Sequence, residues 1–211
     1  MPLQNRVTPL GDIVATRERG LFTGNRGIIH DPRTRTLLTR RWTSRAWLIC
    51  VLQWRGVRRN LMGEGSWTEL FFLDEATALA AGHRPCFLCR RPAAEAFQAN
   101  FPMRQQEVTP KAGDIDGVLH AERLDRRRKR LHALTSPAAD LPDGAMILQD
   151  GTPHLILGGV ARPWAPSGYG APAAALDSAQ LITPPSTLAV LKDGYAPMIH
   201  PSAFGGAGPH L

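Results

Sequence analysis

The sequence lacks long hydrophobic runs and has few cysteines, and each shortage excludes a class of protein. No segment approaches the roughly 18 consecutive apolar residues that a membrane-spanning helix needs. Residues 1–20 also lack the apolar stretch of a secretory signal peptide, so a cytoplasmic protein is expected. Three cysteines are an odd number, which argues against a disulfide framework. In a reducing compartment these thiols stay free to bind a metal.

Several common enzyme signatures are missing as well. The chain contains no P-loop, no dinucleotide-binding GxGxxG, no GxSxG nucleophile motif and no HExxH zinc motif. It also has no internal repeat of about 20 to 50 residues. The sequence therefore leaves open whether the protein is an enzyme.

The chain carries a large positive charge. Its formal net charge is +7 at pH 7 and its isoelectric point is about 10.1, which favours a polyanionic partner over a neutral small molecule. Hydrophobic residues make up 43% and charged residues 20%, a balance typical of a globular protein. The abundance of arginine, alanine and proline is also typical of a GC-rich bacterial genome, so a basic surface without a partner is the alternative.

The first half of the chain predicts strands followed by two short helices. Residues 46–74 are rich in Trp, Ile, Val, Leu and Phe and are broken by glycines, which indicates a three-stranded antiparallel meander. Asp74 stands where a helix N-cap belongs, and Gly82 ends the following run of helix formers. A second helix is predicted from about Pro92 to Asn100.

The second half predicts a basic helix and then a β-rich region. Residues 114–134 have the pattern of one helix with a dense run of arginines. Two apolar runs flank Asp150 and Gly151, which is a strong hairpin signal. A strand and a short helix from Ser186 to Gly194 are expected after a loop rich in Pro, Gly and Ala.

Two of the three cysteines, Cys86 and Cys89, form a CxxC pair. A turn across two residues brings two thiolates to one metal ion, with backbone N–H groups free to bond the sulfurs. The stretch FFLDEATALAAGHRPCFLC, residues 71–89, resembles the second half of the Ada-type zinc-binding domain through its core AGxRPCxxC. The resemblance implies a zinc ion held by both cysteines. Reduced packing thiols and a redox pair are the alternatives.

The resemblance also bears on the remaining zinc ligands. In the Ada-type domain an earlier cysteine pair completes the site, and one of those cysteines accepts a methyl group from a DNA phosphotriester. This chain has no such pair upstream of Cys86. The stretch TGNRGIIHD, residues 23–31, is similar to relatives in which a histidine replaces an early cysteine, which implies His30 as third ligand. Cys50 is the remaining thiol and the candidate fourth ligand, with His83 and Asp31 as alternatives.

A second candidate site is the arginine-rich run RLDRRRKR, residues 123–130. On one helix face such side chains neutralise several phosphates, and the planar guanidinium suits phosphate oxygens. A solvated helical face without a partner is the alternative. The predicted nucleic-acid-binding residues, including the pair after the CxxC, are Arg90, Arg91, Arg123, Arg126, Arg127, Arg128, Lys129 and Arg130.

Other polar residues support further hypotheses. An enzyme acting on nucleic acid or a nucleotide would use residues among His30, His120, Glu122 and His200. Hydroxyls at a predicted helix start would bind an anion, and these belong to Thr183, Ser186 and Thr187. A helix cap and a packed histidine are the simpler interpretation of that segment.

These observations combine into one prediction of fold and function. We expect an α+β protein with a small zinc-stabilised antiparallel meander and short helices at 20–101. A linker and basic helix at 102–139 and a small β-rich domain at 140–204 would follow. The predicted function is zinc binding together with nucleic-acid binding, DNA rather than RNA, in repair or regulation. The alternatives are a metal- or histidine-dependent enzyme and a zinc-stapled protein-interaction module.

Overall fold

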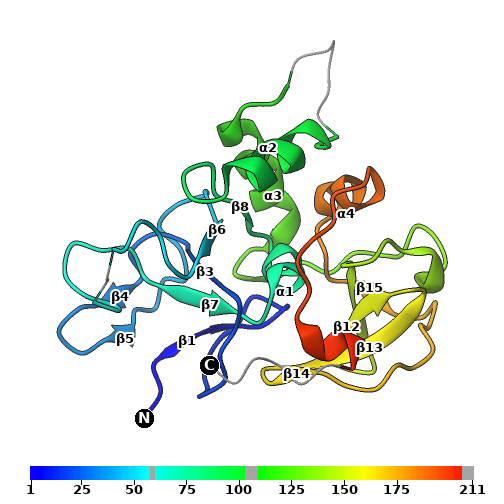
Figure 1. The fold of residues 1–211 in the computed structure, drawn as a ribbon, viewed down its shortest axis with the longest axis horizontal. Helices are drawn as coiled ribbons and strands as arrows, with labels where there is room; N and C mark the ends of the chain where they lie inside the picture. Colours follow the sequence, from blue (N-terminus) through cyan, green and yellow to red (C-terminus); the bar gives the residue numbers. More distant parts are fainter. Residues whose placement is uncertain (58–59, 103–108, 206–211) are drawn as a thin grey trace.

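A computed structural model describes residues 1–57, 60–102 and 109–205 (Figure 1). Those residues form four α-helices, a six-stranded sheet, a five-stranded sheet and two small two-stranded sheets. The fold class is α+β, as predicted. No helix within these ranges combines the length and apolar character that a membrane crossing requires.

The six-stranded sheet mixes parallel and antiparallel neighbours. Its strands are β1 Gln4–Val7, β2 Ile13–Ala15, β3 Phe22–Asn25, β6 Leu48–Val51, β7 Leu70–Phe72 and β8 Arg84–Pro85. Their order is β2-β1-β7-β3-β6-β8. β7 runs parallel to β1 and β8 runs parallel to β6, while the other neighbours are antiparallel.

The structure differs from the predicted meander over 46–74. That range contains β6 and β7, but each pairs with β3 rather than with the other. Thr23 of β3 stands opposite Cys50 on one side and Phe71 on the other. The described part of 52–69 has no strand, and its apolar side chains line a pocket instead.

Two short helices follow β7, as predicted. They are α1 Glu75–Ala80 and α2 Arg91–Ala99. Asp74 caps α1, because its Oδ1 accepts a 2.8 Å hydrogen bond from the N–H of Thr77. Gly82 has a φ of +90°, which lets the chain reverse after the helix. A Cβ at Gly82 would lie 2.6 Å from the side chain of Arg123, so only glycine fits there.

The five-stranded sheet is antiparallel throughout. Its strands are β11 Met146–Gln149, β12 Thr152–Leu157, β13 Val160–Ala165, β14 Gly168–Tyr169 and β15 Gln180–Leu181, in the order β14-β13-β12-β11-β15. Asp150 and Gly151 both have positive φ and connect β11 to β12, which confirms the predicted hairpin. β13 was not predicted, because it lies in the stretch whose prolines and glycines indicate a loop.

The predicted helix over 114–134 ends early. It is α3 Ala112–Arg123, after which Leu124 is already extended. A tight hairpin follows, formed by β9 Leu124–Asp125 and β10 Arg128–Lys129. Arg126 turns the hairpin with a φ of +54°. Like charges one turn apart destabilise a helix, and the hairpin avoids that arrangement.

The remaining elements are short and connect these parts. They are β4 His30–Asp31, β5 Thr36–Leu37, α4 Pro185–Lys192 and two 3-10 turns at Ala138–Asp140 and Pro201–Phe204. α4 begins at Pro185, one residue before the predicted cap, and ends before Gly194. This part of the prediction is confirmed within the usual uncertainty of helix ends.

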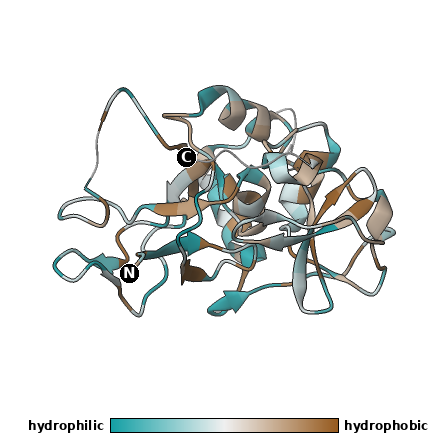
Figure 2. Ribbon diagram, turned by 60° about the horizontal axis from the view of Figure 1, so that its bottom comes forward, coloured by the Kyte–Doolittle hydropathy of each residue, from teal (hydrophilic) through white to brown (hydrophobic). Residues whose placement is uncertain are grey.

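α1 lies between the two large sheets and contacts β7 and β11 (Figure 1). Polar bonds reinforce this packing, since Trp164 donates from Nε1 to Thr77 Oγ1 at 3.1 Å. Tyr169 likewise donates from its hydroxyl to Asp74 at 2.8 Å. Figure 2 shows hydrophobic residues on strands of both sheets and on the helices beside them.

One hydrophobic cluster includes residues from all three predicted segments. Phe22 and Leu79 belong to 20–101, Ile115 to 102–139 and Ile147 to 140–204, and all four are buried in the same cluster. The segments therefore share one core. Part of the predicted linker, residues 103–108, lies outside the described residues.

Candidate metal centre

Two strands and a turn bring the cysteines together. β8 runs beside β6, so that Pro85 stands opposite Ile49 and the N–H of Cys86 donates to the Ile49 carbonyl at 3.0 Å. This register places Cys86 next to Cys50, the following residue of β6. The turn that follows Cys86 brings Cys89 close to both of these cysteines.

The three sulfurs fit a shared metal ion. The Sγ atoms of Cys50, Cys86 and Cys89 all lie within 4.8 Å of one another. Tetrahedral zinc with Zn–S bonds of about 2.3 Å requires neighbouring sulfurs about 3.8 Å apart. Small side-chain movements therefore suffice to form a three-thiolate site. Thiolate donors also select soft metal ions such as Zn²⁺ or Cu⁺ over Mg²⁺ or Ca²⁺.

Contacts among the thiols set their protonation. Hydrogen bonds from the thiols of Cys50 and Cys89, and from backbone N–H groups including that of Leu88 at 3.4 Å, lower the pKa of Cys86. The contacts with Cys86 and Cys89, together with burial, raise the pKa of Cys50. These contacts favour the thiolate form of Cys86, and a metal ion bound to the cluster would displace protons from the other sulfurs.

An apolar pocket opens beside the three sulfurs. It has a volume of about 640 Å³, and all three cysteines line it together with side chains such as Leu48 and Phe71. Pockets of this size hold small organic ligands. Among its described lining residues Glu69 is the only carboxylate. Its oxygens accept hydrogen bonds from the N–H of Met62 at 2.8 Å and from Ser66 Oγ at 3.1 Å.

The structure does not bring the predicted histidine ligand into the cluster. His30 is buried, and its Nδ1 lies 2.6 Å from Thr68 Oγ1 while Nε2 lies 3.2 Å from the Gly63 carbonyl. Within the described ranges no His, Asp or Glu joins the three cysteines. Cys50, predicted as the fourth ligand, thus occupies the third position.

The two alternative ligands also lie elsewhere. His83 is fully buried between Trp47 and Phe72, at ring distances of 5.0 and 4.7 Å. Burial, with the charges of nearby arginines, lowers the pKa of His83, so it is a neutral core residue. Asp31 accepts a hydrogen bond from the N–H of Arg33 at 2.9 Å, in the turn between β4 and β5.

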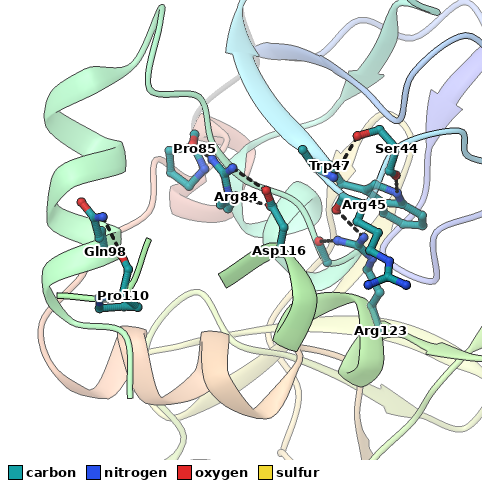
Figure 3. Close-up of polar contacts among 11 residues, drawn as sticks. Ser44, Arg45, Trp47, Arg84, Pro85, Gln98, Pro110, Asp116 and Arg123 are labelled. Carbon is teal, nitrogen blue, oxygen red and sulfur yellow. Dashed lines mark hydrogen bonds and ion pairs between the residues drawn. The ribbon is translucent and has the colours of Figure 1, made fainter. Parts of the chain in front are cut away.

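A buried ion pair fixes the strand that leads into the CxxC. Arg84 donates from Nε and Nη2 to the two carboxylate oxygens of Asp116, both at 2.8 Å (Figure 3). The side chains are only 6% and 10% exposed. The arginine of the AGxRPCxxC core therefore attaches the cysteine loop to α3. Sequence reasoning missed this pair, because 32 residues separate its members.

Three of the predicted nucleic-acid-binding residues point inward. Arg90 forms an ion pair with Glu75 at 2.7 Å and lies over the ring of Phe22. Arg123 is 1% exposed and donates to the carbonyls of Gly82 and Arg45. Lys129 donates from Nζ to the carbonyl of Ala80. The exposed members of the predicted set are Arg91, Arg126, Arg127, Arg128 and Arg130.

The other catalytic and anion-binding candidates have internal partners. Glu122 accepts hydrogen bonds from both the N–H and the Oγ of Ser186, at 3.0 and 2.7 Å. A carboxylate of the chain itself thus occupies the predicted anion site at the start of α4. His120 bonds Arg123 at 2.9 Å, and His200 bonds Ser202 at 2.9 Å. The structure does not bring these residues into the cysteine cluster.

Comparisons with known proteins do not extend this description. The chain matches no protein-family model, and the searches among characterised proteins and among solved structures also find no match. The class that the fold and site define is an α+β protein with a three-cysteine cluster able to hold a metal ion. The functional conclusion rests on this site.

Proposed function

We propose that this protein binds zinc through Cys50, Cys86 and Cys89 and keeps a fourth, exchangeable position for a small soft ligand. The observation that carries the proposal is the position of all three sulfurs in the wall of one apolar pocket. The resemblance of residues 81–89 to the Ada-type zinc loop supports zinc as the metal. Sites with three protein ligands and one open position are typical of catalytic rather than structural zinc.

The chemistry of the donors indicates which ligand the fourth position takes. Zinc with three thiolates would be an electron-rich Lewis acid that prefers another sulfur donor to a hard oxygen donor. The pocket walls, which include Leu52, Val57 and Leu61, favour a ligand with an apolar body. A hydrophobic thiol satisfies both requirements.

Cobalt substitution tests the exchangeable position. We expect the Co²⁺-substituted protein to change its visible spectrum saturably when benzyl mercaptan is added, because the thiol enters the metal coordination sphere. Benzyl mercaptan should bind at least about tenfold more tightly than 2-mercaptoethanol, since burying a ring contributes roughly 1.5–3 kcal/mol. Benzylamine serves as the hard-donor control. The proposal is contradicted if the Co²⁺ spectrum already indicates four sulfur ligands and does not change when either thiol is added.

Nucleic-acid binding is a second candidate function, and one observation favours it. Arg126, Arg127, Arg128 and Arg130 are exposed on or next to the β9–β10 hairpin, with no carboxylate bonded to them among the ion pairs of the described residues. Exposed arginines that take part in no ion pair among the described residues suit the phosphates of DNA. A role in DNA repair or regulation would combine this surface with the zinc site.

The salt dependence of DNA binding tests this second candidate. We expect duplex binding to weaken steeply with salt, and the double variant Arg126→Asn with Arg130→Ala to reduce the slope of log K against log [salt] by up to about two. Asparagine tolerates the positive φ of position 126. Fluorescence anisotropy of a labelled duplex in a KCl series provides the measurement.

The matched control removes the same charge elsewhere, at the exposed residues Arg17 and Arg33, both replaced by alanine. It should leave the slope nearly unchanged. Equal slopes for wild type and for both double variants would leave the basic surface without a specific role. The zinc-stapled interaction module would then be favoured.

A further inference from the structure

A second pocket, distinct from the one beside the cysteines, is surrounded by positive charge. Its volume is about 510 Å³. One of its lining residues is a carboxylate, the exposed Asp12, which takes part in none of the ion pairs found among the described residues. The basic residues that line it are Arg26, Arg41, Arg123, Arg127, Arg128 and Lys129. We call it the cationic pocket.

Two of the arginines are held rigidly in its wall. The guanidinium carbons of Arg26 and Arg123 each lie 3.9 Å from the ring centroid of Trp47. Arg26 is 2% exposed, and it donates from Nη1 to the Gly11 carbonyl at 3.0 Å and from Nε to His83 at 3.2 Å. Cation–π contacts and neutral acceptors thus orient the cations without neutralising them.

Among the described residues, no carboxylate forms an ion pair with Arg26, Arg123 or Lys129. Nη2 of Arg26 and Nε of Arg123 are buried and have no hydrogen-bond partner in that part of the chain. The bonds that Arg123 and Lys129 do make go to neutral acceptors, the carbonyls of Gly82 and Ala80 among them. Buried charges normally have an ion-pair partner, because desolvation without one costs several kcal/mol.

The lowered pKa values of Arg26 and Lys129 also reflect positive charges held close together. Burial, and then the charge of Arg123, lowers the pKa of Arg26 to about 9. Burial, followed by the charges of Arg123 and Arg26, lowers the pKa of Lys129 to about 7. Such mutual repulsion is relieved when an anion enters between the cations.

We propose that the cationic pocket binds the phosphate group of a phosphorylated ligand. Guanidinium groups suit phosphate oxygens, and Arg26, Arg123 and Lys129 line this pocket together. The volume leaves room for a nucleotide-sized molecule around the phosphate. The ring of Trp42, which also lines the pocket and is half-buried, supplies a stacking face for a base. This inference requires neither zinc nor the apolar pocket.

The principal test removes one charge from the pocket wall, that of the half-buried Lys129. In wild type, inorganic phosphate and deoxyadenosine 5′-monophosphate should raise the melting temperature and bind in calorimetry, whereas deoxyadenosine should not. Lys129→Met should weaken both phosphate probes at least about tenfold, as expected for loss of a charged hydrogen bond of about 1.5 kcal/mol or more. Lys192→Met removes the same charge from the exposed surface of α4 and should change nothing.

Further variants and probes make the test independent of whether Lys129→Met folds. If Lys129→Met fails to fold, Arg41→Ala replaces an exposed residue of the pocket wall and should still weaken phosphate binding. A 5′-phosphorylated oligonucleotide compared with its 5′-hydroxyl form distinguishes a nucleic-acid end from a free nucleotide. Arg126→Asn with Arg130→Ala lies outside the pocket and should leave phosphate binding intact, which separates this proposal from DNA binding by the hairpin.

The proposal is overturned if wild type binds neither phosphate probe. It is also overturned if deoxyadenosine binds as tightly as its monophosphate, since the phosphate would then contribute nothing. Equal phosphate affinity in wild type, Lys129→Met and Arg41→Ala has the same consequence. A loss shared by Lys192→Met would indicate non-specific screening of net charge rather than a pocket.

Discussion

Replacing Cys50 by serine is expected to abolish the tight zinc binding that we propose, with a loss of affinity of more than about 100-fold. Loss of an outer hydrogen-bonding partner of a zinc ligand already costs about 10- to 100-fold, and Cys50 supplies one of only three sulfurs in the cluster. Because zinc binding contributes to folding free energy, the variant should also melt at a lower temperature. Metal analysis of protein purified without added metal, followed by chelator competition, provides the measurement.

His30→Ala is the informative control for this experiment. His30 is bonded to Thr68 and Gly63, so its loss should reduce stability but leave the zinc content unchanged. The cobalt spectrum of wild type adds a readout independent of variant folding, since thiolate-to-cobalt bands report sulfur ligation directly. Full zinc occupancy in Cys50→Ser together with loss in His30→Ala would return His30 to the ligand set. Copper in place of zinc would change the metal but not the ligands.

Replacing Arg84 by methionine is expected to destabilise the protein by about 3–5 kcal/mol. The change leaves Asp116 buried without its partner, and breaking a buried ion pair from one side costs that much. The exposed pair of Arg91 and Glu95, at 3.4 Å, is the matched comparison. Arg91→Ala should change the free energy of unfolding by less than about 1 kcal/mol. Urea denaturation of zinc-loaded protein measures both.

The double variant Arg84→Met with Asp116→Leu separates charge from packing. Apolar residues of similar volume often replace a buried ion pair without loss, so the double variant should recover most of the stability that Arg84→Met loses. Additive losses would mean that the two side chains act independently. In that case the arginine of the AGxRPCxxC core does not work through α3.

Local signals in the sequence predicted local structure well. Asp74 and Gly82 delimit α1, and Asp150 with Gly151 forms the β11–β12 hairpin, because caps and tight turns depend on a few adjacent residues. The hydropathy pattern failed to predict strands correctly where pairing with residues distant in the sequence determines the structure. In the described part of 52–69, apolar residues line a pocket and form no strand. β13 forms in spite of its proline because β12 and β14 pair with it.

The candidate site likewise combines residues that local sequence signals identify with one that only strand pairing identifies. Cys86 and Cys89 were identified by their CxxC spacing together with the resemblance of AGxRPCxxC to the Ada-type zinc loop, and both signals are local in the sequence. His30 was favoured over Cys50 by the similarity of a short stretch, but the pairing of β6 with β8 brings Cys50 to the CxxC. The register of a parallel pair has no signal in the intervening sequence. Only the folded chain reveals which thiol is third.

The arginines show most clearly the difference between what the sequence determines and what the tertiary structure determines. The sequence by itself determined that the chain is basic, that arginines are concentrated at residues 123–130 and that two cysteines form a CxxC pair. Only the tertiary structure decided which cations face solvent. A helix end at Arg123 turns that side chain into the core beside Arg26, which lies far away in the sequence. Both cations are buried and take part in no ion pair found among the described residues, an arrangement that no local pattern encodes. This arrangement underlies the phosphate binding that we propose for them.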